Sequence, residues 1–128
     1  MLLDTDFVID FHREAQTTRP LGARRFLQTQ TGKPLQISLV TWMEFAEGFS
    51  LEQRIACEAF LSKFLLLRPN QEIAWRASRI ARLLRQEGRV IGDQDIWIAA
   101  TALEYDEPLV TRNLRHFQRI PGLELLTY

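Results

Sequence analysis

Residues 1–13 read MLLDTDFVIDFHR, an apolar segment followed by an acid and then an amphipathic segment. The run Met1–Asp4 is typical of a short buried strand that ends in a carboxylate. Phe7, Val8 and Phe11 recur at helical spacing, which predicts a helix over Thr5–Arg13 directly after that strand. The order of strand, acid and helix is the first half of a βαβ unit, with an acidic side chain at the carboxyl end of its strand.

The same alternation continues along the rest of the chain. Further strands are expected at Leu35–Val40, Leu65–Leu67, Leu109–Thr111 and Leu123–Leu126. Helices are expected at Leu21–Thr31, Thr41–Phe49, Leu51–Phe64, from the cap Asn70 to Glu87, and at Gln94–Tyr105. Strands that alternate with long helices favour parallel pairing, so the pattern predicts an α/β fold with helices on both faces of a parallel sheet. The polar and apolar alternation in Leu35–Val40 indicates that this strand is partly exposed or lies at a transition.

Length and composition restrict the class of protein. The chain has 128 residues, of which 46 % are hydrophobic and 25 % charged, so we expect one ordered domain, 1–128, rather than a disordered or fibrous chain. No apolar run is long enough to span a membrane, and the early acids are unlike a signal peptide. The single cysteine, Cys57, suits a reducing compartment, so we expect a cytoplasmic protein with no membrane association.

The charge balance bears on nucleic-acid binding. Sixteen basic residues match sixteen acidic ones, which argues against a binding protein that relies on a large positive net charge. All the basic residues except Lys33 and Lys63 are arginines, whose planar fork suits phosphate. Arginines recur every third residue from Arg76 to Arg85, and this band is interpreted as a solvated helix face, as a track for RNA phosphates or as a docking site for an acidic partner.

Acidic and amide side chains stand next to the expected strands in four separate segments of the chain. These residues are Asp4, Glu44, the pair Asp93 and Asp95, and Asn113. Because ligands of open α/β sheets bind at the carboxyl ends of the strands, we expect these side chains to share one edge of the sheet. Clustered carboxylates repel one another, and a hard divalent cation such as Mg²⁺ or Mn²⁺ removes that penalty. Such a cation can activate a water molecule against a phosphodiester.

Each of these residues also has a plain structural interpretation. Asp4 and Asp93 are good helix N-caps, and Asp95 favours the positive end of a helix dipole. The segment from Thr41 to Glu44 fits a capping box, and Asn113 fits a turn. Other side chains carry weaker signals: Asp6 is expected to face solvent, Cys57 to lie in the core, and His12 and His116 to be surface or packing residues.

Taken in order, the segments resemble the PIN-domain family, and within it the VapC-type toxin ribonucleases. The matching stretches are Leu2–Asp6, Met43–Phe45 with Gly48, Gly92–Ala100, Leu109–Asn113 with Phe117, and Arg119–Leu123. The resemblance covers essentially the whole chain. It implies a three-layer α/β/α fold with a short parallel sheet, and cleavage of RNA, of the tRNA or rRNA class, by metal-activated water.

The resemblance also assigns roles to residues. It places the catalytic and metal-binding acids at Asp4, Glu44 and Asp95, with Mg²⁺ as the cofactor and Mn²⁺ as its substitute. The family's fourth acidic position falls on Asn113, an amide without charge, and we hypothesise that Asp93 supplies the missing charge. Auxiliary contacts to these acids are expected from Thr5, Thr111 and Asp6, and contacts to RNA from Arg112 and Arg115.

Partners follow from the same resemblance. VapC-type toxins are silenced by a cognate VapB-like antitoxin, whose tail lies across the acidic pocket, and they commonly form homodimers. Two other functions stay open at this point. One is a degenerate PIN domain that binds RNA or protein without catalysis, which the amide at Asn113 allows. The other is a phosphatase with Asp4 as nucleophile and Asp6 as acid, for which Lys33 and Lys63 are poorly placed.

Overall fold

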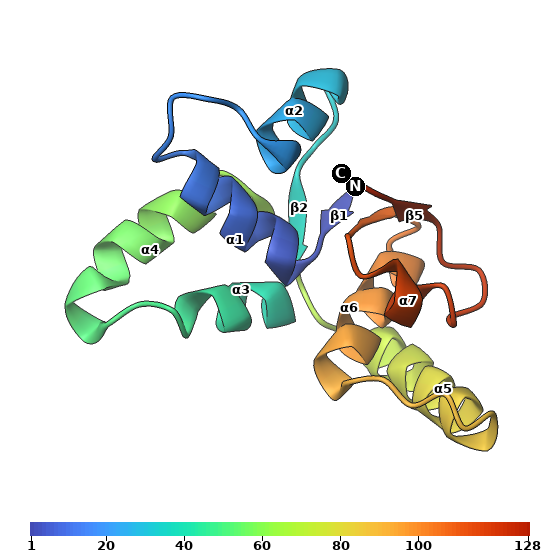
Figure 1. The fold of residues 1–128 in the computed structure, drawn as a ribbon. Helices are drawn as coiled ribbons and strands as arrows, with labels where there is room; N and C mark the ends of the chain where they lie inside the picture. The colour runs from blue at the N-terminus through green and yellow to red at the C-terminus, as the bar shows by residue number, and fades with distance from the viewer.

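The computed structural model describes all 128 residues as a five-stranded parallel sheet between two groups of helices (Figure 1). The strands are β1 (Leu2–Leu3), β2 (Gln36–Ser38), β3 (Leu65–Leu67), β4 (Leu109–Val110) and β5 (Leu125–Leu126). Their order across the sheet is β3-β2-β1-β4-β5, and every neighbouring pair is parallel. The α/β class and the parallel sheet predicted from the sequence are confirmed.

The helices are divided between the two faces of the sheet. On one face lie α1 (Thr5–Glu14), α2 (Gly22–Thr29), α3 (Leu39–Ala46), the 3₁₀ helix η1 (Leu51–Gln53) and α4 (Arg54–Leu61). On the other lie α5 (Gln71–Gln86), α6 (Asp93–Glu104) and the single turn α7 (Leu114–Phe117). Successive residues of a strand point to opposite faces, so Leu2 packs with the α5 and α6 core and Leu3 with the α1 to α4 core. This is the three-layer α/β/α arrangement that the family resemblance implies.

The topology determines where a ligand site can form. The chain leaves β1 toward β2 and β3 on one side and later returns to β4 and β5 on the other side. Between β1 and β4 the direction of winding reverses, and a crevice opens at the carboxyl ends of strands at such a switch point. The residues that follow these strands are Asp4 after β1 and Thr111 after β4.

One prediction about the helix after the second strand was wrong. Of the expected strand Leu35–Val40, the three residues of β2 are buried because β2 is an interior strand, whereas Leu39 is exposed where the chain passes into α3. Helix α3 begins at Leu39 with Ser38 as its N-cap, and the Ser38 Oγ accepts from the backbone N–H of Thr41 at 3.0 Å. Thr41 is therefore a buried helical residue rather than a cap, and no capping box accounts for Glu44.

The expected helix over Leu51–Phe64 is divided and shorter. It opens with η1, which Ser50 and Gln53 cap reciprocally, and continues as α4 only to Leu61. Helix α7 was not predicted. Gly92, not Asp93, is the N-cap of α6, which leaves the Asp93 carboxylate without a capping role. None of the helices is both long enough and apolar enough to cross a lipid bilayer.

Candidate active site

Asp4 is the most buried acid next to the sheet and forms the centre of the site. Its backbone N–H donates to the carbonyl of Val110 in β4, so the residue extends β1 pairing before the chain turns into α1. Its Oδ1 accepts from the Phe7 backbone N–H at 2.8 Å, which makes it the N-cap of α1. Only 4 % of Asp4 is exposed. Asp4 is therefore both the N-cap of α1 and a residue of the site, because the capping bond fixes the carboxylate that lines the site.

The electrostatics of Asp4 separate it from an ordinary capping residue. The pKa of Asp4 is raised to about 6, chiefly by burial and also by the nearby carboxylates of Asp6 and Asp95, against the lowering effect of Thr111 and of the Phe7 N–H. A buried carboxylate with a raised pKa that faces other acids is characteristic of functional sites.

Glu44 reaches the same place from α3. It lies one turn into this helix, half-buried, and Thr5 of α1 donates a hydrogen bond from its hydroxyl to Glu44 Oε2. The neighbour Phe45 is buried in the α1 to α4 core, which sets the rotation of α3 and leaves Glu44 on the side toward α1. Thr5 thus contacts one of the predicted acids, and Thr111 lowers the pKa of another, Asp4.

Asp95 enters from the first turn of α6 and has a partner that sequence reasoning missed. His116 of α7 places its Nδ1 2.8 Å from Asp95 Oδ2 and 2.9 Å from the side-chain amide nitrogen of Asn113. The Asn113 backbone N–H donates to Thr111 Oγ1 at 2.9 Å. The spacing of Asn113 and His116, one helical turn apart, was the available signal, but α7 is too short to show a periodic pattern.

These side chains line one cavity of about 240 Å³, which we call the acidic cavity. Its walls are Asp4, Thr5, Asp6, Ile9, Glu44, Glu47, Asp95, Ile98, Asn113 and Phe117. The acids come from α1, α3 and α6 and the amide from the β4–α7 connection, as the topology requires. Asp6 is exposed, as expected, but it also lines the cavity, and Glu47 is a further acid that the sequence did not single out.

The donor set fits a hard divalent cation. Carboxylate oxygens from several elements are the ligands that Mg²⁺ and Mn²⁺ accept, and Mg²⁺ keeps several waters instead of binding a full protein cage. No three acidic, histidine or cysteine side chains stand close enough to hold a metal ion directly. Glu44 is engaged by Thr5 and Asp95 by His116. The chemistry of the donors therefore suits an ion bound by few carboxylates, with water as the remaining ligands.

Four of the other predicted residues do not line the acidic cavity: the buried Thr111, Asp93, Arg112 and Arg115. Asp93 is exposed and lines a shallow hollow between α5 and α6, where its neighbours include Ala77 and Trp97. This placement gives no support to Asp93 as the source of the charge missing at Asn113. Arg112 is ion-paired with Asp10 and lies over the ring of Tyr128. Arg115 lies on the far side of α7.

Two predictions about aromatic and small residues are confirmed and one is wrong. His12 packs edge-on against Phe45, Phe49 and Phe60, so it is a packing residue. Cys57 is buried in the same core. His116, in contrast, is not a simple surface residue, because it contacts Asp95.

Comparison with known proteins gives a consistent picture. The family model described as "PIN domain" matches residues 1–123. Ribonuclease VapC1 of Haemophilus influenzae (strain R2866) is 33 % identical over 129 residues, which cover 96 % of this chain and 93 % of that protein. Ribonuclease VapC19 of Mycobacterium tuberculosis (strain CDC 1551 / Oshkosh) is 32 % identical over 123 residues, with 96 % of each chain covered.

Solved structures resemble the fold over almost the whole chain. VapBC2 from Rickettsia felis, bound to a DNA fragment from its promoter, superposes with a TM-score of 0.82 at 25 % identity and covers 99 % of this chain and 97 % of that chain. VapBC-1 from nontypeable Haemophilus influenzae gives a TM-score of 0.80 at 31 % identity, with 98 % and 96 % covered.

Proposed function

Since this chain belongs to the PIN-domain family and, within it, to the VapC ribonucleases, we propose that it is a metal-dependent endoribonuclease and the toxin of a toxin–antitoxin pair. One observation supports this most: Asp4, Glu44 and Asp95 come from separate elements and line a single cavity at the switch point of the sheet. The reaction is hydrolysis of a phosphodiester, in which a water oxygen bonds to phosphorus, a P–O bond breaks and the leaving oxygen takes up a proton.

The cofactor is Mg²⁺, with Mn²⁺ as its substitute. When bound, it lowers the pKa of a coordinated water and neutralises charge that develops on the phosphodiester. Asp4 would be the fixed ligand, since the Phe7 N–H holds its carboxylate in place. Glu44 and Asp95 would contact the cation through its water ligands and orient the attacking water, and Thr5 and His116 hold these two carboxylates in position.

The amide at Asn113 limits the number of cations. It brings no charge to the family's fourth acidic position, and the exposed Asp93 faces a different hollow. We therefore favour one tightly bound cation over two. Asn113 instead fixes the connection from β4, because its backbone N–H donates to Thr111.

The partners proposed for this chain are RNA and an antitoxin. The solved neighbours are VapBC complexes, and on that ground we propose a VapB-like antitoxin that covers the acidic cavity. The RNA is of the tRNA or rRNA class. The homodimer and the cytoplasmic location stay predictions.

A non-catalytic binding module is the second candidate, and Asn113 is the observation in its favour. The presence of Asp4, Glu44 and Asp95 around one cavity weighs against it. A phosphatase that uses Asp4 as nucleophile has less support, because neither Lys33 nor Lys63 lines the acidic cavity.

The test is cleavage of total tRNA and ribosomal RNA by antitoxin-free protein. Wild type, Asp4→Asn and Asp95→Asn are compared in Mg²⁺, in Mn²⁺ and in EDTA, with folding checked by circular dichroism. Discrete cuts that vanish in EDTA and in both variants support the proposal. Folded wild-type protein that cuts neither RNA with either metal contradicts it and favours the binding module.

The attacking group is tested with a second substrate. Once a cut site is mapped, the nucleotide on its 5′ side is replaced by a 2′-deoxynucleotide. Attack by water needs no 2′-hydroxyl, so cutting is expected to continue at that bond. Loss of cutting only at the substituted bond would show that the 2′-oxygen, not water, is the nucleophile.

A further inference from the structure

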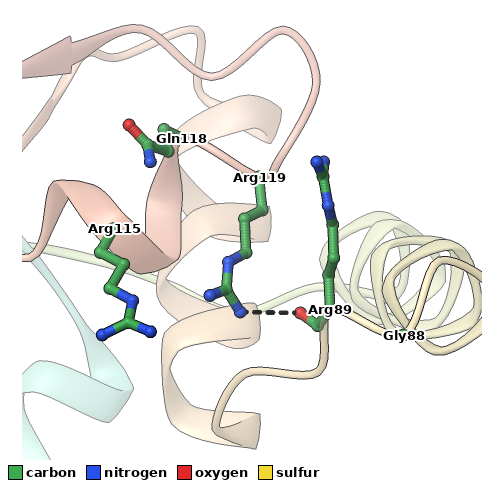
Figure 2. A pocket seen from close by; sticks show the side chains of 5 residues that line it. All are labelled: Gly88, Arg89, Arg115, Gln118 and Arg119. Atoms are coloured by element: carbon green, nitrogen blue, oxygen red, sulfur yellow. Dashed lines mark hydrogen bonds between the residues drawn. The ribbon is translucent and has the colours of Figure 1, made fainter.

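A second cavity, of about 540 Å³, lies on the other side of α7 and is lined only by polar residues and a glycine. We call it the basic cavity. Its walls are Gly88 and Arg89, which follow α5, and Arg115, Gln118 and Arg119, which belong to α7 or follow it (Figure 2). No acidic and no apolar side chain lines it. It is larger than the acidic cavity and opposite to it in charge.

The backbone brings these arginines together from distant parts of the chain. Gly88 has a φ of 65°, which ends α5 in the left-handed region, and the Arg89 N–H then bonds the Leu84 carbonyl at 2.8 Å. This closing turn points the chain toward α7. Arg115 and Arg119 are four residues apart, so they lie on one side of the α7 turn. Asn113 and Phe117, with the same spacing, line the acidic cavity on the opposite side.

The positive charge in the basic cavity is largely unpaired. Arg115 and Arg119 form no ion pair, and the nearest carboxylate to Arg89 is Glu87, at 3.6 Å. Arg119 reaches across the cavity and donates to the carbonyl of Arg89 at 3.2 Å (Figure 2). It also donates to the carbonyl of Val90 at 3.4 Å. Carbonyl partners hold that guanidinium in place without neutralising it. Some arginines elsewhere are neutralised by an acid, as Arg76 is by Glu104 and Arg112 by Asp10.

An unpaired arginine cluster in a concave surface attracts anions, and the planar guanidinium fork matches phosphate oxygens. A peptide partner would usually bury apolar anchors in its interface, and this cavity offers none. RNA needs only charge and hydrogen-bond donors for contacts to its backbone. The two cavities are separated by one helix, a width of about 10 Å, which a strand covers in a few nucleotides.

We propose that the basic cavity binds a backbone phosphate of the RNA substrate, away from the cleaved bond, through Arg89, Arg115 and Arg119. The inference rests on the proposed function, because it places the scissile phosphodiester in the acidic cavity and the strand across α7. The basic cavity increases the affinity for RNA and orients the strand, and the acidic cavity performs the hydrolysis.

The experiment measures RNA binding separately from cleavage. Wild type and the double variant Arg89→Gln/Arg115→Gln are titrated into a fluorescently labelled single-stranded RNA of mixed sequence, in EDTA, over a series of KCl concentrations. Arg119 is kept, because it also joins the two segments. The control is Arg19→Gln/Arg25→Gln, which removes the same charge from two exposed arginines without ion pairs near α2. Thermal melting checks that all three proteins are folded.

We expect the Kd of the Arg89→Gln/Arg115→Gln variant to rise about tenfold, as for loss of a charge-assisted hydrogen bond. The slope of log K against log salt should become shallower by about 0.7, the value for one phosphate contact on a single strand. The control should match wild type in both. An unchanged Kd and slope in the cavity variant would overturn the proposal, as would an equal loss in the control.

Two further results would distinguish failure of the basic-cavity proposal from failure of the proposed nuclease function. If the wild type cuts RNA and the cavity variants bind RNA normally, only the proposal that the basic cavity binds phosphate is overturned. Wild type that binds RNA through the arginines but never cuts it would overturn only the nuclease. A poly-glutamate peptide is tested in parallel: arginine-dependent binding of the peptide alone would assign the cavity to an acidic protein, against the proposal.

Discussion

The acidic cavity and the basic cavity are opposite in how their charges are held. The acidic cavity is built where strands end, and its central carboxylate, Asp4, is buried and bonded to backbone. The basic cavity is built from a helix end and a single turn, and its Arg89 and Arg115 are exposed. A fixed, desolvated charge is suited to chemistry on a reacting group, whereas exposed arginines are suited to a flexible polyanion.

The largest effect on the cleavage rate is expected from a comparison of two acids in the first turn of α6, Asp95 and Asp93. Asp95→Asn is expected to lower the RNA cleavage rate by about a thousandfold, because loss of a carboxylate to the cation removes several kcal/mol of transition-state stabilisation. Asp93→Asn, two residues away and outside the acidic cavity, should stay within about threefold of wild type. Single-turnover assays with one RNA measure both. An equal loss in Asp93→Asn would place that residue in the site.

The acidic cavity should also destabilise the metal-free protein. The folded-state pKa of Asp4, about 6, lies above the ordinary value of 3.8, so the folded state holds this proton over a pH range in which the unfolded chain has lost it. The protonated Asp4 is the form that the folded protein tolerates best. Its contribution to folding stability is therefore complete below about pH 4 and is lost as the pH rises through 6. The cost at pH 7 is about 2 to 3 kcal/mol for a shift of this size.

Asp4→Asn removes that cost and keeps an N-cap for α1. Urea unfolding of the metal-free protein should show the variant more stable by about 2 to 3 kcal/mol at pH 7 and equal to wild type at pH 3.5. Arg115→Gln should change stability by less than about 0.5 kcal/mol at either pH, since that side chain is exposed. A destabilised Asp4→Asn at pH 7 would mean that the carboxylate is stabilised by contacts that outweigh its burial.

A smaller effect is expected from His116, which holds Asp95 but does not reach the reacting atoms. His116→Ala should lower Mn²⁺ affinity and the cleavage rate by about 10- to 100-fold, the usual range for a residue that orients a metal ligand. His116→Gln keeps a donor and should recover part of both. Electron paramagnetic resonance of added Mn²⁺ measures the affinity. Equal affinity in wild type and His116→Ala, with a lower melting temperature, would make His116 a packing residue.

The sequence predicts the acidic cavity better than the basic one, and the reason is local. Strand β1, Asp4 and α1 follow one another directly, so spacing alone places the acid at a strand end. Asp95 also lies in the first turn of a helix, where an acid is easily recognised, and Glu44 lies in the second turn of α3. The exact start of α3 was wrong because Ser38 and Thr41 are both good caps, and β2 pairing ended the strand at Ser38.

The basic cavity leaves no comparable signal. Arg89 and Arg115 are far apart in sequence and meet only because α5, α6 and α7 pack together. Helix α7 has four residues, too few for a hydrophobic period, and the same turn places His116 against Asp95. In the sequence the most visible basic feature is the band from Arg76 to Arg85, yet Arg76 is paired and Arg79 stacks on Trp75.

The division of labour between the two cavities is tested most directly by kcat and KM on one RNA. Asp95→Asn should lower kcat by more than about a hundredfold and change KM by less than about threefold. Arg89→Gln/Arg115→Gln should raise KM about tenfold and leave kcat within about threefold. Loss of kcat in the arginine variant with KM unchanged, or an unchanged kcat in Asp95→Asn, would contradict the assignment of chemistry to one side of α7 and binding to the other.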